Sequence, residues 1–149
     1  MRLIVTDSTP AGRSFVASAE PVEVGRAMAE LWVTSPEEPL GRPGDPKARH
    51  LMPPRGGAHW RIVDLPPDEV MRPLFEKGVP HHDERGFHRT ESVDYILVMA
   101  GQVTLELDEG AVDLGPGDLV VQRRTNHAWR NKTASKVRLL CLMQSLEAP

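Results

Sequence analysis

Residues 88–101, HRTESVDYILVMAG, begin with polar and ionisable side chains and run directly into an apolar strand pattern. Side chains two residues apart on a strand point the same way, so a regular strand places His88, Thr90 and Asp94 on one face. Ile96 continues that face, which marks it as the interior. A histidine and an aspartate in an apolar interior are costly unless they are paired, hydrogen-bonded or bound to a metal. The stretch therefore predicts a sheet interior that carries chemistry.

Short β-rich segments separated by turn signals fill most of the chain. In VTLEL (103–107) apolar residues alternate with polar ones, which is the period of a half-buried strand. Gly-, Pro- and Asp-rich turns such as DSTPAG and GPGD separate the segments, and one helical turn is expected around DEVMRPLF (68–75). The other predicted strands are 2–6, 12–18, 29–35, 58–65, 111–114, 119–123, 127–131 and 136–143. This pattern predicts an all-β fold, an antiparallel sandwich or barrel.

Composition narrows the classes of function. The chain has 149 residues, enough for one domain, and a net charge of -3 from 18 basic and 21 acidic residues. It lacks the basic field that nucleic-acid binding requires, and it has no apolar run long enough to cross a membrane. A single cysteine, Cys141, fits a reducing compartment and lies in an apolar run, which favours a core position. We therefore expect a cytoplasmic protein with no nucleic-acid or membrane partner.

A proline-rich stretch separates the N-terminal part of the chain from the rest. Eight of the 14 prolines fall between Pro36 and Pro67, so residues 36–57 are predicted to form an irregular loop. Within one domain spanning 1–149, residues 1–57 would supply N-terminal strands and this loop, and 58–149 the barrel core. The loop would close over the barrel or brace a dimer, and the sequence does not separate these alternatives.

A second inward-facing histidine lies on a later strand. His127 and Trp129 share a parity in the segment after the GPGD turn. If the strands face each other in a closed barrel, His88, Asp94 and His127 converge as two imidazoles and one carboxylate. Such a set suits a divalent first-row metal and leaves positions open for substrate.

Residues 86–131 resemble the cupin superfamily. In the first cupin motif His88 matches the first histidine, Thr90 stands where the second would be, Asp94 replaces the glutamate, and Gly101 follows after six residues. The second motif runs from Gly117 and Asp118 to His127 and Asn131. The resemblance implies a double-stranded β-helix, the cupin jelly-roll barrel, and more narrowly a small single-domain cupin of the group found beside natural-product pathways.

The departures from the motifs concern possible ligands. Cupins with all three histidines and the glutamate usually hold iron, manganese, zinc or nickel, whereas this chain keeps two histidines and a shorter carboxylate. The gap could be filled by a neighbouring group: His81, His82, Glu91 or Gln122. Gln122 also stands where proline is usual in the second motif, and Arg124 where glycine is usual. A glycine there would permit a positive φ that arginine resists.

Two classes of function follow from these residues. In the first, a divalent metal (Zn, Fe, Mn or Ni) held by His88, Asp94 and His127 stabilises an enolate in a non-oxidative lyase, isomerase, cyclase or decarboxylase. The substrate would be a small oxygenated metabolite, polyketide-like or a sugar acid, and iron would instead allow a dioxygenase. In the second, the barrel binds a small ligand without turning it over. The predicted substrate contacts are Thr90, Gln122, Trp129 and His82.

Each of these residues also has a structural interpretation. The histidines and Asp94 could form a metal-free polar network, and His82 could be a solvated loop residue. Trp129 could be a core side chain, while Tyr95 has the opposite parity to Asp94 and should point away from the cavity. The free edges of strands 2–6 and 12–18 predict a homodimer.

Overall fold

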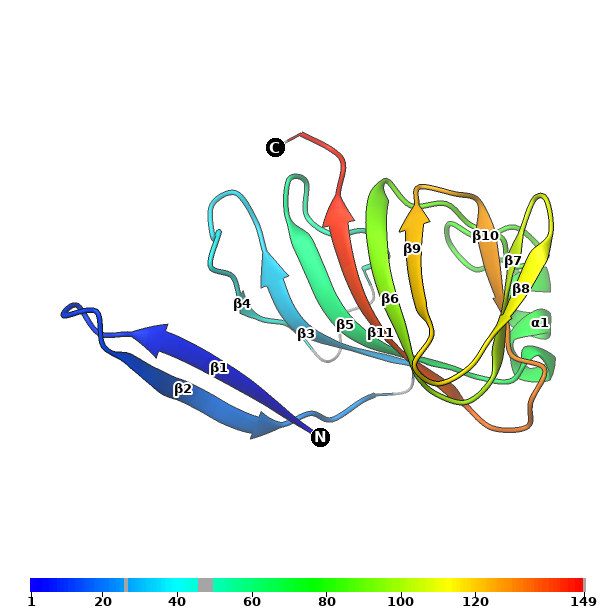
Figure 1. Ribbon diagram of the computed structural model, residues 1–149. Helices are drawn as coiled ribbons and strands as arrows, with labels where there is room; N and C mark the ends of the chain where they lie inside the picture. The colour runs from blue at the N-terminus through cyan, green and yellow to red at the C-terminus, as the bar shows by residue number, and fades with distance from the viewer. Residues whose placement is uncertain (26, 46–49, 149) are drawn as a thin grey trace.

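The computed structural model describes residues 1–25, 27–45 and 50–148, whose regular elements are eleven strands and one helix. Two sheets form a barrel (Figure 1). The larger has the order β4-β3-β5-β11-β6-β9 and the smaller the order β10-β7-β8. The strands are β3 (Met28–Thr34), β4 (Arg42–Pro43), β5 (Ala58–Leu65), β6 (Ser92–Ala100), β7 (Val103–Leu107), β8 (Ala111–Leu114), β9 (Leu119–Arg123), β10 (His127–Arg130) and β11 (Val137–Ser145). The all-β prediction is confirmed.

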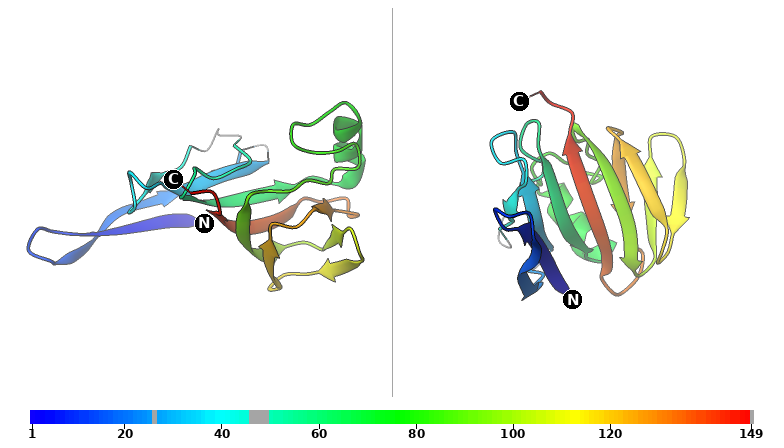
Figure 2. Two further views of the ribbon diagram at one scale, coloured as in Figure 1. Left: turned by 90° about the horizontal axis from the view of Figure 1, so that it is seen from above. Right: turned by 60° about the vertical axis from the view of Figure 1, so that its left-hand side comes forward.

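A separate hairpin precedes the barrel. It consists of β1 (Arg2–Ser8) and β2 (Ser14–Pro21), which pair with each other as a two-stranded sheet. Figure 2 shows this hairpin extending away from the barrel beyond the edge formed by β3 and β4. At the opposite end lies the helix α1 (Asp68–Glu76), which covers the predicted helical turn and has no buried residue.

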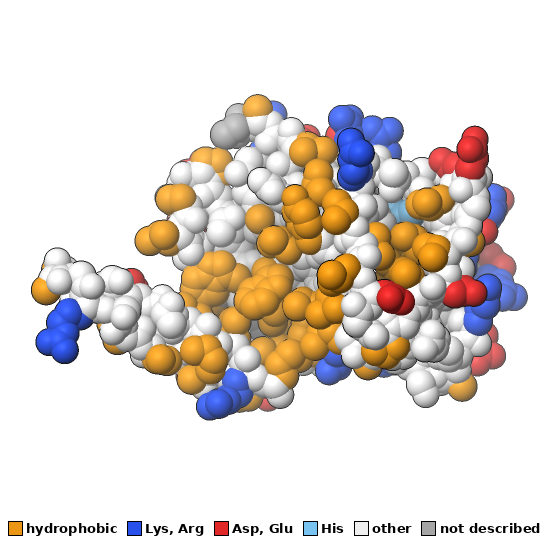
Figure 3. Space-filling view, in the orientation of Figure 1, with side chains coloured by type: hydrophobic (Ala, Val, Ile, Leu, Met, Phe, Trp, Pro, Cys, Tyr) orange, Lys and Arg blue, Asp and Glu red, His pale blue; other side chains and the backbone are white. Residues whose placement is uncertain are grey.

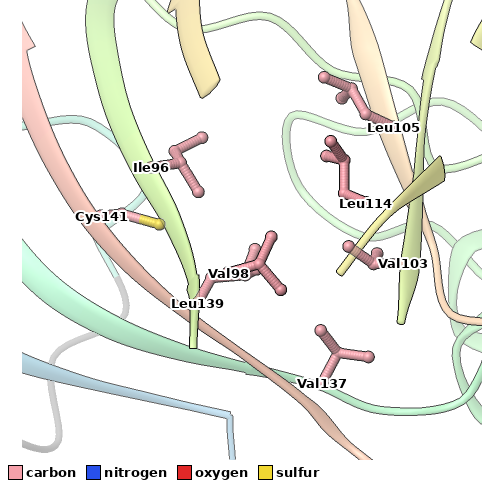
Figure 4. Packing of buried hydrophobic residues seen from close by; sticks show 8 residues of the cluster. All are labelled: Ile96, Val98, Val103, Leu105, Leu114, Val137, Leu139 and Cys141. Carbon is pink, nitrogen blue, oxygen red and sulfur yellow. The ribbon is translucent and has the colours of Figure 1, made fainter. Parts of the chain in front are cut away.

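The core lies between the two sheets, where the inward residues of each strand meet. Alternate positions on β6 and β11, such as Val98 and Leu139, point toward Val103 and Leu105 of β7 (Figure 4). Cys141 belongs to this core, and burial raises the pKa of its thiol to about 12. The core interpretation of Cys141 is therefore confirmed.

The polar start of residues 88–101 is not part of the strand. The strand β6 begins at Ser92, and His88 is held instead by an isolated bridge to His127, with backbone N–O distances of 2.9 and 3.0 Å. The parity argument that extended one regular strand back to His88 was therefore wrong in its geometry. A paired segment outside the sheet, rather than the strand itself, brings the two histidines together.

Arg124 adopts the conformation that its motif position normally reserves for glycine. Its φ is 57°, in the left-handed region. Its Nε lies 2.6 Å from a carboxylate oxygen of Glu91. This ion pair connects the turn before β10 to the segment before β6.

Candidate functional site

One cavity of about 230 Å³ collects the predicted site residues inside the barrel. The seven that line it are His82, His88, Thr90, Asp94, Gln122, His127 and Trp129. The rest of the wall is mostly apolar and comes from the larger sheet, α1 and the proline-rich segment. It includes Met28, Leu51, Val63, Leu65, Met71, Ile96, Leu139 and Met143.

Sheet register places the polar side chains opposite one another. Asp94 of β6 pairs directly with Gln122 of β9, so their side chains share the inner face. The bridge to His88 places the segment before β6 beside β10. Because His127 starts β10, its ring enters the cavity from the smaller sheet, across from Asp94 and Gln122.

The Asp94 carboxylate accepts hydrogen bonds on both oxygens. The hydroxyl of Ser92 donates to Oδ1 at 2.5 Å, and that of Thr90 lies 3.4 Å from Oδ2. Nε2 of Gln122 donates to Oδ2 at 3.1 Å. The hydroxyl oxygens of Ser92 and Thr90 lie 2.9 Å apart. The carboxylate is thus held by neutral donors in a dry environment.

Gln122 connects this carboxylate to His127. The Nδ1 of His127 lies 2.9 Å from the carbonyl oxygen of Thr125, so Nδ1 carries the proton and Nε2 is the basic atom. Nε2 accepts from the Gln122 amide at 3.0 Å. One amide nitrogen therefore bridges Asp94 and His127, while the amide Oε1 is buried with no partner among the described residues.

Three histidine rings form a row along the cavity. The ring centroids of His82 and His88 are 4.3 Å apart, and those of His88 and His127 are 4.2 Å apart. Trp129 stands edge-on to His127 at 6.3 Å. The buried Nδ1 of His88 makes no hydrogen bond within the described part of the chain. His82 is half-buried and contacts His88, whereas His81 is exposed.

Burial shifts the pKa of each of these groups toward its uncharged form. Desolvation, followed by repulsion from His127 and His82, lowers the pKa of His88 to about 3. Desolvation also lowers the pKa of His127, although the Thr125 carbonyl and Asp94 oppose the shift. The same desolvation raises the pKa of Asp94 against the hydrogen bonds from Ser92 and Thr90. A dry cavity favours uncharged forms of acids and bases alike.

Arg61 and Ser92 are polar residues of the cavity region that were not predicted. Arg61 of β5 is 2% exposed and lines the cavity, and Ser92 is fully buried beneath Asp94. The sequence AHWRIVDL already indicated an inward position for Arg61, because Arg61 lies two residues before Val63, which faces inward. Its guanidinium donates to the carbonyl oxygens of His50 and Leu51 at 2.9 and 2.8 Å.

The predicted three-ligand metal centre was tested against this geometry. His88 and His127 fit a divalent ion, because neutral imidazoles are nitrogen donors. Asp94 does not fit, because its oxygens accept three hydrogen bonds and the Gln122 amide nitrogen stands between it and the basic nitrogen of His127. Among residues 1–25, 27–45 and 50–148, no three His, Cys, Asp or Glu side chains are arranged to hold a metal ion. The full set therefore does not fit a shared ion, and we derive no reaction step through one.

Comparison with known proteins identifies the class. The family described as "Cupin domain" matches residues 75–143, the region that holds every predicted site residue. The matched residues are similar to the cupin family, and the two facing antiparallel sheets agree with the jelly-roll barrel that the motifs predicted. None of the described helices is long and apolar enough to span a membrane.

Several fungal proteins are similar over part of their length. Phomopsin biosynthesis cluster protein C′ of Diaporthe leptostromiformis is 42% identical over 79 residues, covering 52% of this chain and 34% of the relative. Oryzines biosynthesis cluster protein J of Aspergillus oryzae is 36% identical over 78 residues, covering 50% and 44%. The cupin-domain-containing oxidoreductase virC of Hypocrea virens is 29% identical over 117 residues, covering 74% and 53%. The chain thus spans about a third to a half of the length of these curated relatives.

Solved cupin structures are more distant. The Cupin 2 conserved barrel domain protein from Salinispora arenicola aligns with a TM-score of 0.41 and 16% identity, over 60% of this chain and 64% of that chain. The DMSP lyase DddQ from Ruegeria pomeroyi aligns with a TM-score of 0.44 and 19% identity, over 62% and 41%.

Proposed function

We propose that this protein is an enzyme of small-molecule biosynthesis that moves a proton on an apolar, oxygenated metabolite. The reaction class is non-oxidative: an isomerisation, cyclisation, dehydration or decarboxylation through an enol or enolate. The observation that carries the proposal is a pair of neutral imidazoles, His88 and His127, side by side in a mainly apolar cavity. The names of the fungal relatives, which refer to biosynthesis clusters, support a natural-product substrate.

The cavity wall favours one of the two substrate types expected from the sequence. A sugar acid needs hydrogen-bonding partners around most of its surface, whereas 12 of the 20 residues that line this cavity are apolar. A volume of about 230 Å³ accommodates a molecule of one or two small rings. We therefore favour a polyketide-like substrate with few oxygens, held between Trp129 and the methionines.

The proton chemistry is assigned to the side chains. Nε2 of His127 is the unprotonated ring nitrogen, so it can take a proton from a carbon next to a substrate carbonyl. Displacement of the Gln122 amide by the substrate would free this nitrogen, and the amide could then donate to the developing enolate oxygen. Asp94 accepts a hydrogen bond from the Gln122 amide and so holds Gln122 in register, and Thr90 in turn contacts Asp94. The protonated His127 then returns the proton to the substrate at a second position, beside His88.

We assign no reaction step to the divalent ion that the sequence predicted. His88 and His127 would hold it, and it would supply Lewis-acid stabilisation of an enolate. The roles of His88, Asp94 and His127 as ligands remain predictions that elemental analysis of the purified protein can test.

Hydrogen–deuterium exchange into a substrate mimic tests the proposal. We expect the protein to accelerate exchange of the methyl protons of 4-hydroxyacetophenone in D₂O, measured by NMR. His127→Asn should abolish the acceleration, and His81→Asn is the matched control, since His81 is exposed and outside the cavity wall. Parallel samples with and without added Zn²⁺, Mn²⁺ or Fe²⁺ separate metal-assisted from metal-free exchange.

Three other outcomes of these experiments would point away from the proposed reaction. Binding of ketones in the cavity without any exchange would favour the non-catalytic ligand-binding cupin. Loss of substrate under oxygen with added iron would favour the dioxygenase alternative; the name of virC, an oxidoreductase, supports an oxidative reaction in general. Absence of both binding and exchange across a set of aromatic ketones would contradict the proposed substrate class.

A further inference from the structure

A separate cavity lies against the proline-rich segment. Its volume is about 440 Å³, and its wall comes from β3, β4, β5 and that segment. None of its described lining residues borders the cavity that holds His88 and His127. We name this cavity the Glu30 pocket. The residues that line it are Glu30, Val33, Arg42, Asp45, His50, Met52, Pro53, Pro54 and His59.

Strand register brings buried polar side chains to this pocket. Glu30 of β3 pairs with Arg61 of β5, and Val33 pairs with His59, so these side chains share the inner face of the sheet. Hydrophobic side chains gather instead on the outer face of the larger sheet (Figure 3). Glu30 is 7% exposed and His59 is 3% exposed. A carboxyl group buried this deeply is costly unless a donor or a cation satisfies it.

One carboxyl oxygen of Glu30 has no donor. Its Oε1 is buried and makes no hydrogen bond with any residue that the structure describes. Nδ1 of His59 lies 3.6 Å from it. That nitrogen accepts a hydrogen bond from Nη2 of Arg61 at 3.2 Å, and burial lowers the pKa of His59 to about 4. At neutral pH Nδ1 therefore carries no proton and cannot donate to Glu30.

The charges around the pocket leave room for a cation at Glu30. Among the described side chains, Arg61 attracts Glu30 only from a longer distance and forms no ion pair with it. Arg42 already has a partner, because its Nε lies 2.9 Å from a carboxylate oxygen of Glu38. The apolar part of the wall consists of Val33, Met52, Pro53 and Pro54. This combination fits a molecule with one positively charged donor and a short apolar body.

We propose that the Glu30 pocket binds a small primary ammonium compound, with its nitrogen at Oε1 of Glu30 and its apolar part against Met52 and the prolines. An ammonium group brings three donors and a positive charge. Charge-assisted hydrogen bonds to a carboxylate are about twice as strong as neutral ones. Binding would therefore satisfy the one Glu30 oxygen that the fold leaves without a donor.

This compound is a second ligand and not the substrate of the cavity of His88 and His127. Arg61 lies between the two spaces and connects their walls. Its guanidinium donates to the carbonyl oxygens of His50, which lines the Glu30 pocket, and of Leu51, which lines the other cavity. The proposal therefore does not depend on the reaction proposed above.

An NMR titration of the ¹⁵N-labelled wild-type protein with n-butylammonium chloride at pH 7 tests the proposal. The amides of Glu30, Met52 and His59 should show saturable shifts, while those of β7 and β8 stay unchanged. Two analogues serve as controls: 1-butanol has no charge, and n-butyltrimethylammonium has no N–H donor. Each should bind about tenfold or more weakly, which is the loss expected for a hydrogen bond to a charged group.

Glu30→Gln tests the carboxylate directly. This variant should bind n-butylammonium about tenfold or more weakly than the wild type. Glu109→Gln is the matched control, since Glu109 is exposed in the turn between β7 and β8, and it should bind like the wild type. Far-UV circular dichroism checks that both variants are folded. If Glu30→Gln does not fold, the comparison of ligands on the wild-type protein decides.

Three results would overturn the proposal. The first is the absence of saturable shifts at Glu30, Met52 and His59 in the wild type. The second is binding of 1-butanol as tight as that of n-butylammonium. The third is a folded Glu30→Gln variant with wild-type affinity for n-butylammonium.

Discussion

His59 should make the protein labile in mild acid. It is 3% exposed on β5, and desolvation, followed by the charge of Arg61, lowers its pKa to about 4. Nη2 of Arg61 donates to Nδ1 of His59 at 3.2 Å, so that ring nitrogen must be unprotonated. The carboxylate of Glu30, 3.6 Å from the same nitrogen, favours protonation but does not outweigh these effects.

The size of the effect follows from the two pKa values. In the unfolded chain the ring titrates near 6.5, above its folded pKa of about 4. As the pH falls, the unfolded state therefore takes up the proton first, and stability is lost through this window and no further below it. Between pH 7 and pH 5 the loss from His59 alone is about 2 kcal/mol, at about 1.4 kcal/mol per pH unit. The free energy of unfolding of a typical domain is only about 5–15 kcal/mol in total.

Urea unfolding at pH 7 and pH 5 measures this loss. His59→Gln keeps an acceptor for Arg61 but does not titrate, so its free energy of unfolding should fall by about 2 kcal/mol less than that of the wild type between the two pH values. His81→Asn, at an exposed position with a positive φ that asparagine tolerates, should keep the wild-type pH dependence. Equal pH dependence in the wild type and His59→Gln would refute the reasoning.

Two further substitutions test the cavity and the core. Gln122→Leu removes the amide that bridges Asp94 and His127. It should lower the free energy of unfolding by about 1–3 kcal/mol, because two buried acceptors lose their donor while one unpartnered oxygen is removed. A variant as stable as the wild type in urea would show that the bridge is not made in solution. Leu139→Ala in the core should cost about 2–5 kcal/mol, whereas Leu40→Ala, 88% exposed, should stay within about 0.5 kcal/mol. Thermal unfolding of the two variants in parallel checks this contrast.

Alternation along the chain was sufficient to find most of the strands. The predicted spans 58–65, 103–107, 111–114 and 119–123 coincide with β5, β7, β8 and β9. Each is bounded by turn residues and has one apolar face, so local chemistry and burial agree. The prediction that Tyr95 points away from the cavity is also confirmed, because it is exposed on the outer face.

Long-range contacts explain what the sequence could not show. The left-handed backbone of Arg124 is accompanied by an ion pair to Glu91, 33 positions earlier in the chain. Likewise the position of His88 depends on its bridge to His127, and no local pattern encodes that pairing. The bridging role of Gln122 required the register of β6 against β9. Residue types suggested which side chains matter, but only the fold decided which atoms meet.

The proline-rich segment 36–57 was expected either to close over the barrel or to brace a dimer. The contacts of Arg61 bear on the first role, for the C-terminal part of the segment. The buried guanidinium holds the backbone of His50 and Leu51 by two hydrogen bonds, and Leu51 forms part of the cavity wall. This end of the segment is therefore part of the cavity wall. The same desolvation that a closed wall provides lowers the pKa of His88 and raises that of Asp94. Opening this wall would rehydrate the histidines and return their pKa values toward ordinary ones. Arg61 of β5 holds the wall in place, so it helps to keep the histidines neutral.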